Sequence, residues 1–298
     1  ICSPNTVNLE TGNLQSIMWR NGKKESHVVP YKPYCYVPDA ETGKQYNRTG
    51  KEGSILLRKE YYRAGEELPS SLILDGGREN IMDRLVIEHP DYFNKFANDQ
   101  PVKSLCFDIE THSPDGSFPF GENYPVVAIG IVTSTGEREV YLWDGEDDKQ
   151  VLMDFAKFVK EYDPDIIYGY NLVGYDIPQI LYRAAYHGIR NYKKLLNRDG
   201  SDYGWQPQKD SDDLRMRAGG RVVLDILRHT RLDYALSGLP RGLKPVSKYF
   251  GLEPIELDFA EKDLLDYSLS EIHDYVLSDV DCTKYLFDHY YPRLEFTA

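Results

Sequence analysis

The chain has 298 residues, of which 41% are hydrophobic and 28% charged, and its formal net charge is −13. This composition is typical of a globular protein with one large domain or two ordinary ones, and the apolar runs are too short to span a bilayer. Four scattered cysteines without a C-x-x-C pair argue against a zinc site or a disulfide framework and indicate a reducing compartment.

The first residues, "ICSPNTVNLETGN", lack the basic start and apolar core of a signal peptide, and the absence of an initiating methionine leads us to expect a trimmed or incomplete N-terminus. Residues 1–100 are predicted to be rich in strands, because aromatic or alternating segments such as "SIMWRN" and "YCYVPD" are separated by Gly and Pro. A helical segment is predicted over 77–96 and a linker over 97–103.

From residue 104 the pattern changes to that of an α/β domain. Three strands close together in sequence are followed by helices and strands in alternation and by a long final helix, which predicts a mixed sheet covered by helices. The predicted strands are 104–109, 126–133, 138–143, 164–171 and 220–229, and the predicted helices are 147–162, 176–188 and 268–291.

The negative net charge argues against a nucleic-acid partner, because phosphates are neutralised by lysine and arginine. The charge is uneven, however: residues 183–248 contain fourteen lysines or arginines against seven acids. This segment is either a solvated face of mixed charge or a surface that follows a nucleic-acid backbone.

Two acids stand at the end of the first strand of the α/β domain. Asp108 and Glu110 are two residues apart, so their side chains point to the same face of the strand. Such neighbours repel each other and are costly to desolvate. They are either the hydrated end of a strand or ligands of a divalent cation, because hard cations bind clustered carboxylates.

Two further segments offer acids beside apolar residues. Asp176 opens the helix 176–188, where it is either the N-cap, an interpretation that Pro178 supports, or another metal ligand. In the final helix Tyr275 and Asp279 are four residues apart and therefore share a face.

Together these segments resemble the three exonuclease motifs of family B DNA polymerases, found in archaeal and eukaryotic replicative enzymes. The motifs are "FDIET" (107–111), "YNLVGYDIP" (170–178) and "YVLSD" (275–279). The resemblance covers most of the chain. It implies an exonuclease domain at 101–298, with an RNase H-like mixed sheet flanked by helices and an inserted β-hairpin near 197–222, preceded by a smaller strand-rich N-terminal domain at 1–100.

The resemblance also implies two-metal-dependent 3′–5′ exonucleolytic hydrolysis of DNA, the proofreading activity of a DNA-directed DNA polymerase, with two Mg²⁺ or Mn²⁺ ions. Asp108 would bridge both ions, Glu110 and Asp279 would complete the first site, and Asp176 would hold the second ion. Tyr275 would orient the attacking water.

The implied substrate is the 3′ end of single-stranded or frayed DNA. By resemblance, the residues that position the 3′-terminal nucleotide are Thr111, Asn171 and Tyr175. Phe118 and Phe120 are candidates for stacking on bases, whereas Phe107 is expected to pack in the core.

No polymerase palm motif follows the third exonuclease motif, so we expect either a fragment that lacks palm, fingers and thumb or a free-standing repair exonuclease. The expected partners are DNA, the missing polymerase domains and a sliding clamp that contacts them; a non-catalytic DNA-binding scaffold is the remaining alternative. Pro33 and Tyr34 align with part of the uracil pocket of archaeal relatives or simply pack a strand turn. The expected location is the nucleoid of a prokaryote or the nucleus of a eukaryote.

Overall fold

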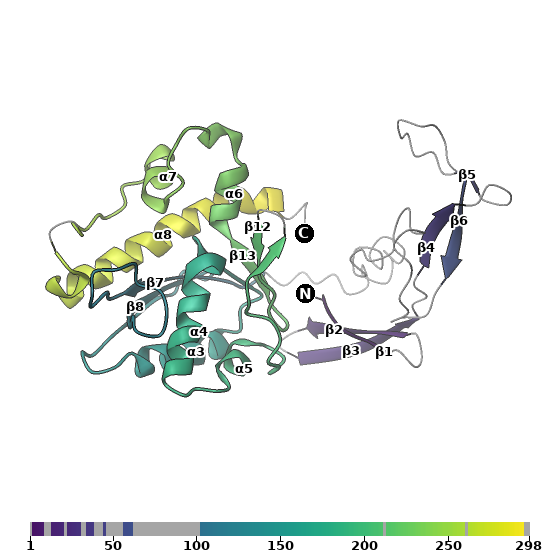
Figure 1. Ribbon diagram of the computed structural model, residues 1–298, viewed down its shortest axis with the longest axis horizontal. Helices are drawn as coiled ribbons and strands as arrows, with labels where there is room; N and C mark the ends of the chain where they lie inside the picture. Colours follow the sequence, from purple (N-terminus) through teal and green to yellow (C-terminus); the bar gives the residue numbers. More distant parts are fainter. Residues whose placement is uncertain are drawn as a thin grey trace. The chain divides into compact units, whose positions relative to one another are not determined.

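The chain divides into two compact units, Cys2–Gln100 and Pro101–Ala298. The computed structural model describes residues 102–210, 213–259 and 262–294, with the side chains of 209–210, 213–214 and 292–294 left out, and in the first unit the backbone of six strands (Figure 1). The helix predicted over 77–96 lies outside the described residues.

The first unit contains two antiparallel sheets of three strands, with orders β1-β2-β3 and β4-β6-β5. The segments "SIMWRN" and "YCYVPD" fall on β2 and β4. The strands are β1 (Cys2–Asn8), β2 (Asn13–Arg20), β3 (Lys23–Pro30), β4 (Tyr34–Pro38), β5 (Lys44–Gln45) and β6 (Leu56–Tyr61).

The second unit is built on a five-stranded mixed sheet of order β13-β10-β7-β8-β9, which confirms the predicted mixed α/β fold. Strands β7, β8 and β9 are antiparallel neighbours, whereas β10 runs parallel to both β7 and β13. The strands are β7 (Ser104–Thr111), β8 (Val126–Thr133), β9 (Arg138–Leu142), β10 (Ile166–Gly169) and β13 (Val222–Asp225).

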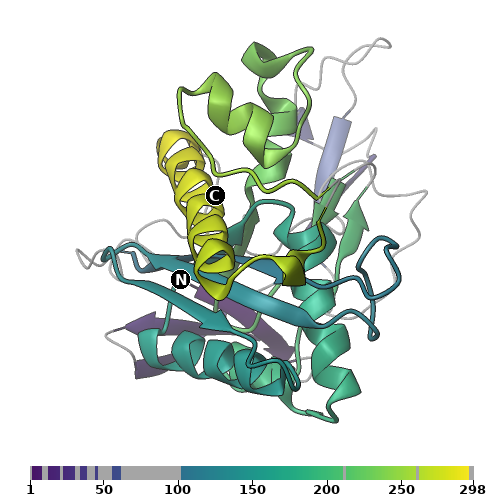
Figure 2. The same cartoon turned by 90° about the vertical axis from the view of Figure 1, so that its left-hand side faces the viewer.

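Helices cover both faces of this sheet (Figures 1 and 2). Helices α3, α4 and α5 pack on one face, and α8 lies across the other with α6 and α7 beside it. The helices are α3 (Lys149–Tyr162), α4 (Ile177–Tyr186), α5 (Tyr192–Leu196), α6 (Ile226–Leu232), α7 (Leu243–Tyr249) and α8 (Leu269–Leu294). None of the helices in the described part of the chain has the length and apolar composition that a membrane crossing needs.

Strand β7 is buried on both faces because it lies in the middle of the sheet. Leu105, Phe107 and Ile109 join the core beneath α3 and α4, whereas Cys106 joins the core beneath α8. The ring of Phe107 lies 4.6 Å from that of Phe155, which confirms the predicted core role of Phe107. The next residues on the α8 side of β7 are the two acids of the first motif.

The strand predicted over 220–229 is too long. Strand β13 ends at Asp225 and α6 begins at Ile226, because the Asp225 carboxylate accepts a hydrogen bond from the backbone N–H of Leu227 and caps the helix. Between α5 and β13 the chain forms a two-stranded antiparallel hairpin, β11 (Gln208–Asp210) and β12 (Asp213–Arg215).

Four cations of the basic segment 183–248 are paired inside the fold rather than open to solvent. Arg183, Arg198 and Arg221 have buried side chains that pair with aspartates of other segments, and Lys244 pairs with an aspartate of α8. Four of the fourteen cations of this segment are therefore paired within the fold, which leaves fewer of them to follow a nucleic-acid backbone.

A buried ion pair ties α4 to the start of α3. Asp148, fully buried, accepts hydrogen bonds from Arg183 Nε and Nη2 at 2.8 and 2.7 Å, and it lies 2.5 Å from His187 Nε2. It also accepts from the backbone N–H of Val126 at 2.8 Å. Burial alone raises the pKa of this carboxyl, but these hydrogen bonds and the arginine charge outweigh burial and lower it.

The Asp148→Asn variant is expected to lose about 3–5 kcal/mol of unfolding free energy at pH 7, because the buried Arg183 is left without its countercharge. The pKa of Asp148 is lower in the folded protein than the value of about 3.9 of a free aspartate. Its ionised carboxylate therefore stabilises the fold above about pH 3.9, and this stabilisation is lost as the pH falls through the lower pKa of the folded protein. Urea unfolding from pH 7 downward should therefore show a constant difference between the two proteins above about pH 4 and a shrinking difference below it. Asp154→Asn, which alters an acid bonded to Gln150 of the same helix, is the control; a constant difference at every pH would contradict this account.

Candidate active site

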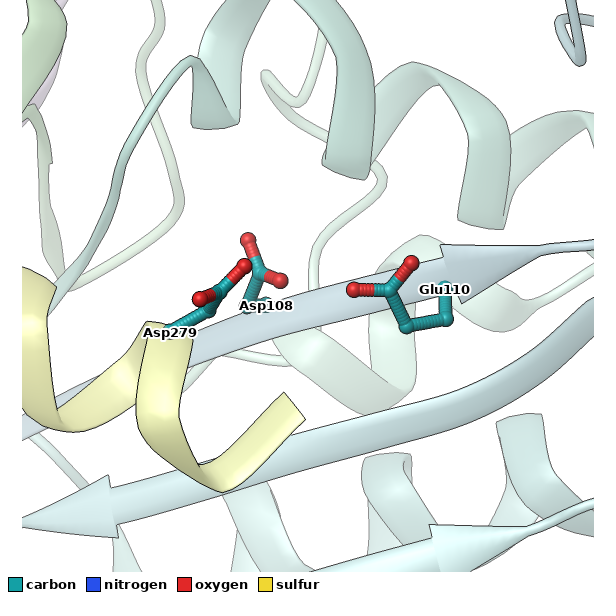
Figure 3. A group of neighbouring side chains, drawn as sticks. All are labelled: Asp108, Glu110 and Asp279. Carbon is teal, nitrogen blue, oxygen red and sulfur yellow. The ribbon is translucent and has the colours of Figure 1, made fainter. Parts of the chain in front are cut away.

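Three carboxylates meet between β7 and α8. Asp108 and Glu110 project from the same face of β7, and Asp279 reaches them from α8 (Figure 3). One carboxylate oxygen of each lies within 4.8 Å of the others. We call Asp108, Glu110 and Asp279 the acidic cluster.

Helix α8 can approach the sheet closely because β8 has a glycine beneath it. A Cβ atom at Gly130 would lie 2.9 Å from Val276 Cγ2, closer than side chains tolerate. A capping box fixes the start of α8, since Ser268 and Glu271 exchange hydrogen bonds. One helical turn apart, Tyr275 and Asp279 then face the sheet, and both are largely buried.

Asp176 ends a π-helical turn, Leu172–Asp176, that leads into α4. It stands at the N-cap position of α4, but its side chain makes no capping hydrogen bond. It is 3% exposed, and its Oδ2 atom has no hydrogen-bond partner among the described residues. Burial raises its pKa, and so do the nearby charges of Asp108 and Asp225. Asp176 is therefore a buried carboxyl beside the acidic cluster with an unused oxygen.

Asp225 shapes the turn that presents this carboxyl, a role that the sequence pattern did not reveal. Its two carboxylate oxygens accept hydrogen bonds from the backbone N–H groups of Asn171 and Val173 at 2.9 and 3.0 Å. Asn171 adopts a left-handed conformation with φ 65°, which asparagine tolerates better than most residues. The sequence signal for Asp225 is its place before a helix, where aspartate is a common cap.

Thr111 and Tyr175 join the first and second motifs directly. Thr111 Oγ1 lies 2.6 Å from the Tyr175 hydroxyl, which donates to the backbone carbonyl of Pro119 at 2.7 Å. Burial raises the pKa of Tyr175 to about 12, although the hydrogen bond with Thr111 lowers it. Phe118 and Phe120 flank the Tyr175 ring at 5.5 and 5.9 Å.

Lys244 brings a positive charge into the acidic cluster. Its ammonium group forms an ion pair with Asp279 and lies 4.2 Å from the centre of the Tyr275 ring. Burial lowers the pKa of Lys244, while the charges of Glu110 and Asp108 raise it. Nothing in the local sequence distinguishes this lysine from its basic neighbours, so its role emerges only from the fold.

Burial dominates the electrostatics of the two acids of β7. It raises the pKa of Asp108 to about 7, against the lowering effect of Lys244. Burial and the charge of Asp108 together raise the pKa of Glu110 well above its usual range. Burial also raises the pKa of Tyr275, with the charges of Glu110 and Asp108 adding to it, so its hydroxyl keeps its proton. Such crowded carboxyls are stabilised by any cation that binds between them.

The remaining candidate residues belong to the first unit. Pro33 lies outside the described residues, and only the backbone of Tyr34 is described, at the start of β4 opposite Tyr61.

The geometry agrees with what comparison with known proteins finds. Residues 132–246 match the family described as DNA polymerase family B, exonuclease domain. This part of the chain is therefore similar to the exonuclease domain of DNA polymerase family B. The matched residues include Asp176 and Lys244. Strand β7 and helix α8 lie outside the matched residues, but β7 belongs to the same sheet as the matched strands β10 and β13, and α8 packs on that sheet.

Proteins with similar sequences include DNA polymerases. The DNA polymerase delta catalytic subunit of Candida albicans is 28% identical over 56% of this chain and 18% of its own length. DNA polymerase 2 of Aeropyrum pernix is 36% identical over 31% of this chain and 12% of its own length. The chain therefore spans less than a fifth of the length of these relatives.

A solved structure shares the fold. The family B DNA polymerase from Pyrobaculum calidifontis superposes with a TM-score of 0.70 at 20% identity, over 98% of this chain and 45% of that one.

Proposed function

We propose that the exonuclease domain removes nucleotides from the 3′ end of DNA by hydrolysis that depends on two divalent cations, Mg²⁺ or Mn²⁺. The observation that carries this proposal is the acidic cluster, in which carboxylates from β7 and α8 approach within 4.8 Å of one another, on a sheet and helices that also include the residues 132–246 similar to a family B exonuclease domain.

The residues present fit such cations. The donors are all carboxylate oxygens, which suit Mg²⁺ and Mn²⁺, and Asp176 Oδ2 is a buried oxygen with no other partner among the described residues. In this proposal Asp108, Glu110 and Asp279 hold one ion, and Asp108 and Asp176 hold the other. Bound there, the ions supply a water activated near neutral pH and stabilise charge on the attacking and leaving oxygens.

The protein's own groups orient the reactants. The Tyr275 hydroxyl, whose pKa is raised by burial and by the charges of Glu110 and Asp108, would donate a hydrogen bond to the attacking water. Thr111, Asn171 and Tyr175 would position the 3′-terminal nucleotide, as the resemblance to the family implies. The exposed ring of Phe118 offers a face for its base. A frayed or mismatched end reaches this site at lower cost, because melting a paired end requires a few kcal/mol.

We further propose that the domain proofreads for polymerase domains of the same protein, because the similar proteins named above are polymerase catalytic subunits. A sliding clamp would then act through those polymerase domains. The location would be the nucleus of a eukaryote or the nucleoid of a prokaryote. A free-standing repair exonuclease would use the same residues.

The polarity of degradation tests this proposal. A single-stranded oligonucleotide labelled at its 5′ end, incubated with the chain and Mg²⁺, should give a ladder of labelled products that shorten one nucleotide at a time, and EDTA should stop the reaction. The same strand paired to a complement should be degraded more slowly, and a 3′ mismatch should restore part of the rate. Immediate release of a labelled mononucleotide would indicate attack from the 5′ end and overturn the proposal.

A further inference from the structure

A row of exposed aromatic rings continues from the acidic cluster along α4. It begins at Tyr175, whose hydroxyl bonds to Thr111 beside Glu110. The Phe120 ring lies 5.9 Å from the Tyr175 ring and 5.3 Å from the Tyr182 ring. Tyr186 follows Tyr182 by four residues, so it lies about 5–6 Å further along the same helix face.

These rings are exposed in spite of their size. Phe120, Tyr182 and Tyr186 have 37%, 47% and 58% of their surface in contact with solvent. Neighbouring rings meet edge to face or tilted, so they do not cover one another's faces. Isolated exposed aromatics are ordinary, but three neighbouring exposed rings, next to a tyrosine that feels the charges of Glu110 and Asp108, are not.

The row is held in place by the helix beneath it. Three side chains of one helix face bind the backbone of the loop that carries Phe120. The Tyr175 hydroxyl donates to the carbonyl of Pro119, and the fully buried Gln179 exchanges hydrogen bonds with both backbone groups of Gly121. One turn on, Arg183 donates to the carbonyl of Glu122. The rings therefore need little ordering when something binds to them, which favours binding.

We propose that Phe120, Tyr182 and Tyr186 form an aromatic track on which bases of the unpaired strand stack upstream of the 3′-terminal nucleotide. This inference rests on the proposed exonuclease function, which places the 3′ end at the acidic cluster. Aromatic rings bind every base through its face, as a nuclease without sequence preference requires. The row consists of rings of this kind, and Phe120 joins it to Tyr175, which bonds to Thr111 of the first motif.

Stacking carries this interaction, with little help from phosphate contacts. Arg183 lies 4.3 Å beneath the Tyr186 ring, but its charge is matched by Asp148. The salt dependence of DNA binding is set by the number of phosphates that the protein neutralises. Because the track neutralises few phosphates, removing its rings should weaken binding by the same factor at low and high salt.

Binding of oligothymidylates of two and nine nucleotides, measured by fluorescence anisotropy in EDTA to prevent hydrolysis, tests the track. The double variant Tyr182→Ala with Tyr186→Ala should bind the nine-nucleotide strand about ten- to one-hundred-fold more weakly than the unmodified chain. Binding of the dinucleotide should change little. Tyr182→Phe with Tyr186→Phe keeps both rings and should restore the affinity, which separates stacking from misfolding.

The control is Tyr249→Ala with Tyr285→Ala, which removes two rings of similar exposure, 52% and 44%, from α7 and α8. Three results would overturn the track. The control could lose as much affinity for the nine-nucleotide strand as the Tyr182 and Tyr186 alanine variant; that variant could keep its affinity for this strand; or it could lose the same factor of affinity for both strand lengths. If the affinity of the alanine variant for the nine-nucleotide strand is unchanged, the row would instead be a protein-docking surface. A length-dependent loss of binding in a chain that degrades no DNA with Mg²⁺ would refute the exonuclease proposal and still support the track.

Discussion

Replacing Asp108 and Glu110 together with alanine is expected to reduce Mg²⁺-dependent release of nucleotides by at least about a thousand-fold. Cations that stabilise transition-state charge contribute several kcal/mol, and each 1.4 kcal/mol is a factor of ten in rate. Without these two acids the acidic cluster keeps only Asp279, which is already paired with Lys244. The rate is measured by release of nucleotides from a single-stranded oligonucleotide.

The same double variant is expected to fold. Burial raises the pKa of Asp108 to about 7, so the ionised carboxylate opposes folding in metal-free protein at neutral pH and above, and protonation relieves this cost as the pH falls. Removing the acid should therefore leave the thermal midpoint in EDTA unchanged or higher. Asp274→Ala with Asp281→Ala is the matched control, because it removes two solvent-exposed acids of α8. Retained activity in the Asp108 and Glu110 variant would place the hydrolysis at another site.

Replacing Lys244 with methionine is expected to make the stability of the protein depend on divalent cations. In metal-free protein the variant should lose up to about 3–5 kcal/mol of unfolding free energy, because the buried Asp279 loses its partner among other acids. A bound Mn²⁺ ion replaces the missing charge, so the loss should largely disappear when Mn²⁺ is saturating.

The cation affinity should change in the opposite direction. Lys244 repels an incoming ion and competes for Asp279, so Lys244→Met should bind Mn²⁺ more tightly, by about ten-fold or more, in a calorimetric titration. Lys248→Met is the matched control, since Lys248 lies one turn further along α7 in an exposed pair with Glu256. An equal loss of stability with and without Mn²⁺ would show that Lys244 acts through packing alone.

The sequence by itself determined the parts of this domain that depend on local periodicity. Side chains alternate in direction along a strand, which placed Asp108 and Glu110 on one face of the strand. Residues four apart share a face of a helix, which placed Tyr275 and Asp279 on one face of the final helix. The order of strands and helices was enough to predict the mixed sheet, because buried strands and amphipathic helices each have their own period. The error at the end of β13 arose where one aspartate, Asp225, both ends a strand and caps a helix.

The tertiary structure alone decided which distant side chains meet. In the sequence, Lys244 cannot be distinguished from the other cations of the basic segment, but in the fold it forms an ion pair with Asp279. Arg183 is likewise a candidate nucleic-acid contact in the sequence, but in the fold it pairs with the buried Asp148. The aromatic track likewise needs a loop and a helix that lie far apart in sequence. Charge pairing and stacking depend on distances of a few ångströms between such segments, whereas residue spacing along the chain specifies only the geometry within one element.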